Sequence, residues 1–176
     1  MDFKEYKDTK PAILIKAFLD LVTEGVFELR IPKTKYGTIS GYFDDTAIAA
    51  GMAAKENGKH SGIYVMVNPV DPSLIARNHN RLEYGSHTTT TDSEIVKRRW
   101  FLIDLDAARP AGISSTDYEV ELAVTRGNDI EEWLTSLGWP APLRGMSGNG
   151  VHLMYRVDEP NDDTTRVEFE MATKRL

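Results

Sequence analysis

The residues best suited to chemistry are two aspartates at the end of an apolar segment. The segment 100–106 reads Trp-Phe-Leu-Ile-Asp-Leu-Asp, which is typical of a strand. Side chains two residues apart point to the same face of a strand, so Asp104 and Asp106 are expected to project together. Neighbouring carboxylates repel, and Mg²⁺ or Mn²⁺ is their usual partner. A D-x-D sequence at a strand end also occurs in ordinary turns, so this pair alone leaves both interpretations open.

A second candidate motif is Ser147-Gly148-Asn149-Gly150-Val151-His152, which opens a predicted strand at 151–157. Gly148 and Gly150 let the backbone approach a phosphate closely, Ser147 offers a hydroxyl, and His152 offers a donor. These four residues are predicted to cradle a triphosphate. Taken alone, S-G-x-G more often forms a tight turn, and a single histidine is more often structural than a ligand.

The two motifs together are more specific than either one. A strand ending in D-x-D, then a helix, then S-G-x-G-x-H on the next strand resembles the archaeo-eukaryotic primase superfamily, in particular the bifunctional DNA primase-polymerases of plasmids, phages and other mobile elements. The likeness covers most of the chain. It extends over 27–32, 37–43, 62–69, 104–112 and 147–152.

The resemblance implies an N-terminal α/β unit joined to an RRM-like sheet that carries the active site. It implies that Asp104 and Asp106 bind catalytic Mg²⁺ or Mn²⁺, and that Ser147 and His152 contact the phosphates of the incoming nucleotide. The implied enzyme is a DNA-directed primase/polymerase. In the implied reaction, which takes place on a single-stranded or primer-template DNA, a 3′-hydroxyl attacks the α-phosphate of a nucleoside triphosphate and pyrophosphate leaves. A helicase domain or protein is a further expected partner.

The chain departs from the family pattern in one respect. The third family motif, a hydrophobic residue followed by Asp, is expected several tens of residues beyond His152. Asp158, Asp162 and Asp163 lie too close to His152 for that role. The last part of the sheet is therefore expected to be missing by truncation at the C-terminus, which puts catalysis by these 176 residues in question.

Two other functions stay open. One is a non-catalytic primase-like module that binds nucleotide or single-stranded DNA in a replication complex. The other is a metal-dependent nuclease or phosphatase that uses Asp104 and Asp106, although this leaves the glycine-rich motif unexplained. Arg109, just past the acids, is expected to contact phosphate or template, or to form a simple ion pair with the aspartates.

Alternating helices and strands must position these motifs, so the fold class is α/β (α+β), with a unit at 1–98 and a partial RRM-like unit at 99–176.

The first helix is expected to bury Ile13, Leu14, Ala17, Phe18 and Leu21, and the last to place Val167, Met171 and Ala172 on one side. Thr116 and Glu119 form a capping box. Segment 78–92 reads as a mobile surface loop. Expected helices are 11–23, 46–58 begun by Asp44 or Asp45, 116–137 with a break near Gly127, and 161–176; expected strands are 26–31 closed by Pro32, 38–43, and a central strand at 62–67.

Composition sets further limits. The net charge of -6 argues against a domain that coats nucleic acid by bulk electrostatics, although basic clusters occur at 77–99 and at Arg30, Lys33 and Lys35. These clusters either line a basic face or are scattered solvated charges. Because there is no cysteine, oxygen or imidazole must hold any metal. No apolar run approaches the roughly 20 residues of a membrane span, so a cytoplasmic protein without a membrane partner is expected.

Overall fold

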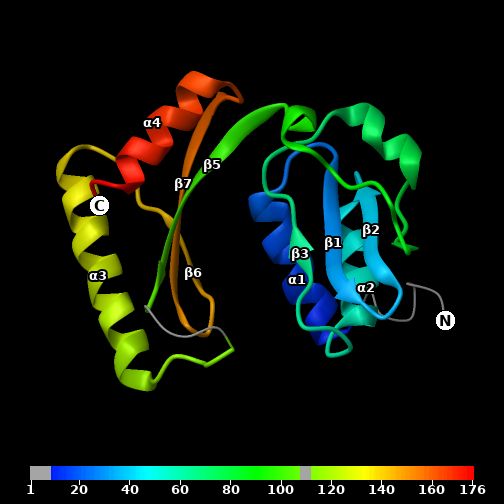
Figure 1. The fold of residues 1–176 in the computed structure, drawn as a ribbon, viewed down its shortest axis with the longest axis horizontal. Coiled ribbons are helices and arrows are strands. Elements are labelled where there is room, and N and C mark those ends of the chain that lie inside the picture. Colours follow the sequence, from blue (N-terminus) through cyan, green and yellow to red (C-terminus); the bar gives the residue numbers. More distant parts are fainter. Residues whose placement is uncertain (1–8, 108–111) are drawn as a thin grey trace. The chain divides into compact units, whose positions relative to one another are not determined.

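The computed structural model describes residues 9–107 and 112–176. The chain divides into two compact units, Met1–Arg98 and Arg99–Leu176, each with its own sheet and helices (Figure 1). The mixed α+β class predicted from the alternating elements is confirmed. No helix in the described parts of the chain is both long and apolar enough to cross a membrane.

The sheet of the first unit has the strand order β3-β1-β2-β4. Its centre is the antiparallel hairpin of β1 and β2, whose register runs from Phe27 opposite Phe43 to Ile31 opposite Ile39. The edge strands are only two residues long. The bounds are Phe27–Thr34 for β1, Gly37–Phe43 for β2, Tyr64–Val65 for β3 and Glu83–Tyr84 for β4.

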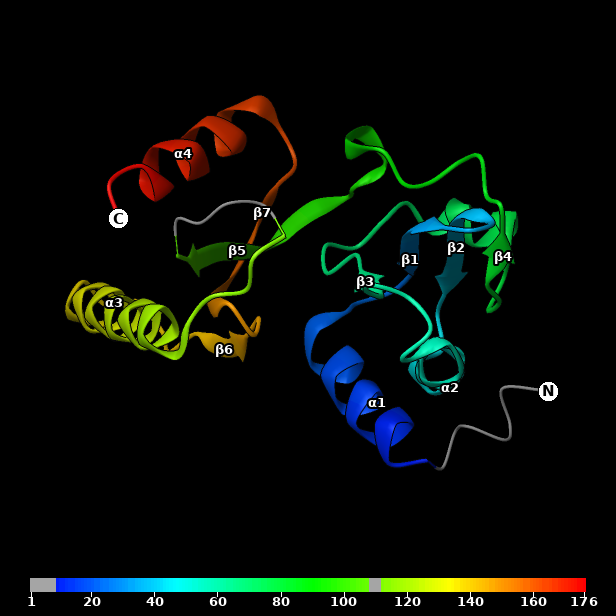
Figure 2. The same ribbon diagram turned by 60° about the horizontal axis from the view of Figure 1, so that its bottom comes forward.

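Helices α1 (Lys10–Val22) and α2 (Thr46–Glu56) pack on the same side of this sheet (Figure 2). Thr9 caps α1, and the Asp45 carboxylate caps α2 by accepting hydrogen bonds from two backbone amides of its first turn. The apolar core joins both helices to β1 and β2. Its buried members are Leu19, Phe27, Leu29, Phe43, Ala49, Ala50 and Ala53.

The prediction of which face of α1 is buried is wrong. Ile13 and Leu14 are 58% and 61% exposed, and Ala17, Phe18 and Leu21 are exposed as well. The helix instead buries Ala12, Leu19 and Val22. Apolar residues occur all round α1, so their spacing does not single out one face. Tertiary packing selects the side that carries Leu19, which shares a core cluster with the alanines of α2.

Two strand predictions in this unit also need correction. Segment 62–67 is not a central strand, because only Tyr64 and Val65 pair with β1, and they do so at the sheet edge with Tyr64 58% exposed. β1 also continues past Pro32 to Thr34. The register shifts between Ile31 and Thr34, and such a bulge tolerates a proline that a regular ladder would exclude.

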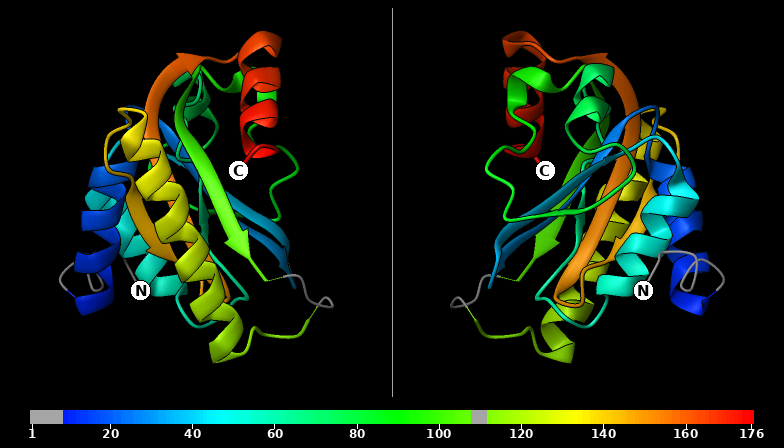
Figure 3. Two further views of the ribbon diagram at one scale, coloured as in Figure 1. Left: turned by 90° about the vertical axis from the view of Figure 1, so that its left-hand side faces the viewer. Right: turned by 90° about the vertical axis from the view of Figure 1, so that its right-hand side faces the viewer.

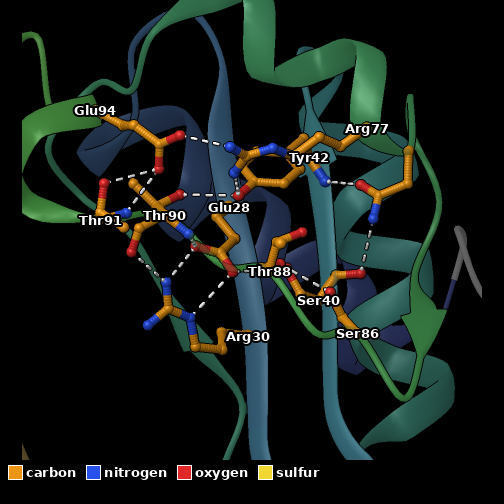
Figure 4. Close-up of polar contacts among 11 residues, drawn as sticks. Glu28, Arg30, Ser40, Tyr42, Arg77, Ser86, Thr88, Thr90, Thr91 and Glu94 are labelled. Carbon is orange, nitrogen blue, oxygen red and sulfur yellow. Dashed lines mark hydrogen bonds and ion pairs between the residues drawn. The ribbon is translucent and has the colours of Figure 1, made fainter.

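The other face of the β1–β2 hairpin buries a charged group, the Glu28 carboxylate (Figure 4). Its oxygens accept hydrogen bonds from Arg30 Nη2 at 2.6 Å, from the Ser40 hydroxyl at 2.6 Å and from the Thr90 amide at 3.1 Å. Burial alone would raise the pKa of Glu28, but these donors together hold that pKa below its ordinary value. The carboxylate therefore stays ionised and cross-links three segments.

The polar network extends outward from Thr90 through hydroxyl groups. The Thr90 hydroxyl contacts the Tyr42 hydroxyl at 3.2 Å, which also accepts a hydrogen bond from Arg77. Arg77 pairs in turn with Glu94 (Figure 4). This chain of contacts uses Arg77, one of the basic residues that the sequence offered as part of a basic face.

Segment 78–92 is predicted to be a mobile surface loop, and most of it does lie at the surface, but parts of it are built into the fold. It contains β4, and both Asn78 and Thr90 are buried. The Asn78 side chain accepts a hydrogen bond from the Tyr42 amide at 2.9 Å and donates to the Ser40 carbonyl. Thr90 looks like a loop residue in the sequence because its partner, Glu28, lies far away along the chain.

The second unit has the element order β-α-β-β-α and the strand order β5-β7-β6 (Figure 3). This succession matches the first five elements of the RRM-like unit expected from the sequence. Helices α3 and α4 pack on one face of the sheet around Phe101, Ile103, Leu153 and Tyr155. The bounds are Lys97–Asp106 for β5, Asp117–Ser136 for α3, Leu143–Met146 for β6, Gly150–Pro160 for β7 and Asp163–Thr173 for α4.

The capping box of Thr116 and Glu119 at the start of α3 is confirmed, with both reciprocal hydrogen bonds present. The expected break at Gly127 is wrong, because α3 runs through it. A side chain there would lie 2.9 Å from Val151, so Gly127 permits the close approach of α3 to β7. Strand β6 was not expected at all.

The last helix is confirmed as α4, but the side that carries Val167, Met171 and Ala172 does not face the core. Val167 and Met171 are 43% and 49% exposed, and Ala172 is exposed. Phe169 packs instead against Phe101, with ring centroids 4.8 Å apart. One large aromatic side chain therefore decides which side of α4 meets the sheet.

We expect Glu28→Gln to lower the free energy of unfolding by about 2 to 4 kcal/mol, because it leaves Arg30 without its buried partner. The matched control is Glu24→Gln, which alters the exposed Glu24–Lys97 pair and is expected to cost less than about 1 kcal/mol. Urea unfolding measures both. Equal small losses would contradict a buried ionic cross-link.

The lowered pKa of Glu28 also predicts a pH dependence. Its stabilising contribution is fully present above the ordinary glutamate pKa of the unfolded chain, and is lost as pH falls through the lower folded-state pKa. The stability difference between wild type and Glu28→Gln should therefore narrow in acid. Urea titrations at a series of pH values measure this, and a difference that widens as pH falls would contradict it.

Candidate functional site

The two aspartates lie on the face of the second sheet that is opposite α3 and α4. Along β5, Phe101 and Ile103 are buried in the core, whereas Leu102, Asp104 and Asp106 alternate with them and are exposed. The alternation follows from the two-residue period of a strand. Both carboxylates therefore project from the face that the two helices leave uncovered.

The same alternation places His152 on that face. Val151, Leu153 and Tyr155 belong to the core, and His152 and Met154 lie between them along β7. Since β7 is the direct neighbour of β5, His152 stands beside the strand that carries the aspartates.

The predicted residues contact one another across the two strands. His152 Nε2 lies 3.2 Å from Asp104 Oδ1, and the Ser147 hydroxyl donates to Asp106 Oδ1 at 3.3 Å. Each acid of the first motif thus meets one residue of the second. The structure brings together groups that are far apart in sequence.

The turn before β7 is organised by Ser147. Its hydroxyl oxygen accepts hydrogen bonds from the backbone amides of Asn149 at 3.3 Å and Gly150 at 3.0 Å. Gly148 has a φ of 88°, a conformation that L side chains rarely adopt. One hydroxyl therefore both holds the turn and reaches Asp106.

Gly150 has a structural role in addition to the phosphate approach predicted for it. A Cβ atom at this position would lie 2.0 Å from the carbonyl oxygen of Leu105 and 2.7 Å from Asp106 Oδ1. The missing side chain is what allows β7 to begin directly against the end of β5. In this structure the glycine serves the junction of the strands that carry the site.

Sequence reasoning missed a further pair that fixes the turn. The Ser115 amide donates to Asn149 Oδ1 at 3.1 Å, and the Ser115 hydroxyl donates to the Asn149 carbonyl at 2.8 Å. These bonds tie the segment before α3 to the turn before β7. The only sign of this Ser115–Asn149 pair in the sequence is that Ser115 immediately precedes the capping residue Thr116.

Asp104 and Asp106 offer some, but not all, of the oxygen ligands that a hard cation needs. The side chains of Asp104 and Asp106 are accessible, with that of Asp104 54% exposed, and they carry like charges on one face. Among residues 9–107 and 112–176, no group of three or more histidine or acidic side chains is placed to hold a metal. Two carboxylates could therefore supply only some of the ligands. Arg109 lies outside the described residues.

The basic residues at the start of β5 do not form a continuous exposed cationic stripe. Arg99 is 6% exposed, and Lys97 pairs with Glu24 at 3.4 Å. Arg99, a member of the basic cluster at 77–99, is therefore neither a solvated charge nor part of an exposed basic face.

Comparisons of the chain with protein-family models, with curated proteins and with solved structures found no match.

We expect Gly150→Ala to lower the free energy of unfolding by roughly 2 kcal/mol or more, because the new methyl group overlaps the main chain of β5. Gly145→Ala is the matched control on β6. The nearest atom to its added methyl group is His152 Cβ at 3.8 Å, so its effect should stay below about 1 kcal/mol. Thermal unfolding measures both, and equal effects would contradict the close approach.

Proposed function

We propose that this chain is a nucleotidyltransferase domain of the archaeo-eukaryotic primase type, which acts as a DNA primase/polymerase. Its substrates would be nucleoside triphosphates and a DNA template, either single-stranded or annealed to a primer. A helicase domain or protein would be its partner at a replication origin or fork, and the cytoplasm would be its compartment.

One observation carries the proposal. Asp104 and Asp106 meet His152 and Ser147 directly, at 3.2 Å and 3.3 Å, on the open face of a sheet with the β-α-β-β-α succession. In the proposed family these two motifs have complementary tasks, since one holds metal and the other holds phosphate. A nuclease or phosphatase would need the acids but gives no reason for the glycine-rich turn beside them.

The proposed roles follow from the chemistry of each group. Asp104 and Asp106 would hold Mg²⁺ or Mn²⁺, which when bound neutralises the charge on the triphosphate and on the leaving pyrophosphate. The hydroxyl of Ser147 and the backbone of the turn at Gly148 would face the phosphates. His152 holds the Asp104 carboxylate in place and would present its imidazole to the nucleotide. Positioning and charge neutralisation, rather than covalent chemistry, would supply the rate.

A second candidate function is binding without turnover. The observation in its favour is that the described residues offer two carboxylates but no group of three potential ligands. A module of this kind would bind nucleotide or single-stranded DNA on the same face.

Primer extension with Mn²⁺ and deoxynucleoside triphosphates tests the proposal. We expect wild type to extend an annealed primer, Asp104→Asn to lose about 100-fold or more of the rate, and His152→Ala to lose about ten- to a hundredfold. Asp129→Asn, an exposed carboxylate on α3, and His87→Ala are the matched controls, and they should retain the wild-type rate.

Foldedness is checked by thermal unfolding. Asp104→Asn and Asp106→Asn should not lower the midpoint by much, because each removes one of two like charges on an exposed face. Calorimetric titration with a triphosphate separates the two candidates. Saturable, metal-dependent binding without extension would favour the binding module, and extension that survives both asparagine variants would contradict the proposed site.

A further inference from the structure

The first unit contains a cavity that has no part in the proposed catalytic face. Its volume is about 640 Å³, and it lies between the tip of the β1–β2 hairpin and the C-terminal end of α2. Pockets of a few hundred cubic ångströms are the usual size for small-molecule sites. Every residue that lines it belongs to the unit Met1–Arg98.

The charge of this cavity is opposite to that of the whole chain. Four lysines line it, Lys33 and Lys35 from the hairpin and Lys55 and Lys59 from the end of α2 and the turn after it. The chain as a whole carries a net charge of -6, so four ammonium groups around one cavity are a local reversal of sign. Such a cavity attracts anions, because low-dielectric walls focus the potential of the charges that line them.

The carboxylate in the cavity wall does not cancel these charges. Glu56 is 4% exposed, and its oxygens accept a hydrogen bond from the Tyr84 hydroxyl at 2.9 Å and contact His60 Nε2 at 2.9 Å and Lys59 Nζ at 3.6 Å. Among the described lining residues Glu56 is the one acid. This one buried carboxylate, already bonded to Tyr84 and His60, does not balance the lysines of the wall.

The helix dipole explains only part of this arrangement. The C-terminus of α2 carries a partial negative charge, which favours a lysine such as Lys55 in the last turn. That effect fades within one turn of the helix, and it gives no reason for Lys33 and Lys35 to come from a separate hairpin. Lys33 also adopts a φ of 56°, an uncommon conformation for lysine that places it at the bulge.

The cavity also offers aromatic surface. The rings of Tyr36 and Tyr84 meet edge to face with centroids 5.6 Å apart, and the two side chains remain about half exposed. Lys35 Nζ lies 4.9 Å from the centre of the Tyr36 ring. Partial burial and the hydrogen bond to Glu56 raise the pKa of Tyr84 to about 12, which keeps its hydroxyl a donor to Glu56. An aromatic face beside clustered ammonium groups suits a flat ring attached to phosphate.

We infer that this cavity, built from the β1–β2 hairpin and the end of α2, is a second ligand site that binds a phosphorylated nucleoside without a metal ion. Lys33 and Lys35 bind the phosphates, Lys55 and Lys59 add positive charge to the wall, and Tyr36 and Tyr84 contact the ring. The buried Glu56 holds Tyr84, His60 and Lys59 in place and does not itself contact the ligand. The ligand is either a free nucleotide or a nucleotide unit of a single strand.

The test is calorimetric titration of the full chain at low salt with EDTA, so that metal-dependent binding at Asp104 and Asp106 is silent. The probes are dATP, inorganic triphosphate and a short oligothymidylate. We expect saturable binding that weakens at least about tenfold in Lys33→Gln/Lys35→Gln, since two charge-assisted contacts are lost. Lys10→Gln/Lys174→Gln makes the same change of charge elsewhere and should bind as wild type does.

The three probes distinguish a free nucleotide from a nucleotide unit of a single strand. Lysine-dependent binding of dATP identifies a free nucleotide, and lysine-dependent binding of oligothymidylate alone identifies a strand. Tyr36→Leu should weaken dATP more than inorganic triphosphate, and equal weakening would overturn the contact with the ring. No saturable binding of any probe, or equal loss in the two double-lysine variants, would overturn the site.

This inference is independent of the proposed catalysis. Asp104→Asn/Asp106→Asn should abolish primer extension and leave the metal-free binding unchanged. Loss of both activities in that variant would place the metal-free binding on the second sheet and overturn the inference.

Discussion

A side chain at position 150 would meet the carbonyl oxygen of Leu105 at 2.0 Å, so β7 can begin beside the end of β5 only where it carries glycine. That close approach fixes where the rest of the candidate site lies. Two residues further along β7, His152 reaches Asp104, and three residues before Gly150, Ser147 reaches Asp106. The strand period then sends these polar groups to the face opposite the helices, while their neighbours fill the core.

The candidate site places electrostatic repulsion at this edge of the sheet. Two carboxylates on one exposed face repel each other, and the His152 imidazole and the Ser147 hydroxyl lie near enough to offset part of that charge. Two acidic side chains of the first unit lie in a different environment. Glu28 and Glu56 are buried and surrounded by donors, so their charges stabilise the fold. The contrast supports a ligand-binding role for the accessible pair.

Local signals in the sequence predicted much of the fold. The cap at Asp45 and the capping box at Thr116 act within a few residues, so the sequence alone shows where those helices start. The apolar run before Asp104 likewise marks β5. The predictions that were wrong concern residues whose environment is set by partners far away in the sequence. The burial of Thr90 needs Glu28, the buried side of α1 needs the alanines of α2, and β6 contains a glycine and follows two prolines, so it has no strand pattern of its own.

The candidate residues of the site came from motif and resemblance, whereas their contacts came only from the structure. No sequence rule states that Asp104 meets His152 or that Gly150 packs on Leu105, because both contacts depend on the strand order β5-β7-β6. The basic cavity shows the same division. Lys33 and Lys35 are neighbours in sequence, but the fold of the hairpin against α2 brings Lys55 and Lys59 to them.

The most direct test of the central claim is paramagnetic broadening of backbone amide resonances when Mn²⁺ is added to the isotopically labelled chain. If the open face of β5 and β7 holds the metal, the signals of 104–106 and 147–152 should broaden first, and Asp104→Asn/Asp106→Asn should abolish the effect. Broadening that is centred elsewhere, or that persists unchanged in this double variant, would contradict a metal-dependent nucleotide site on this face.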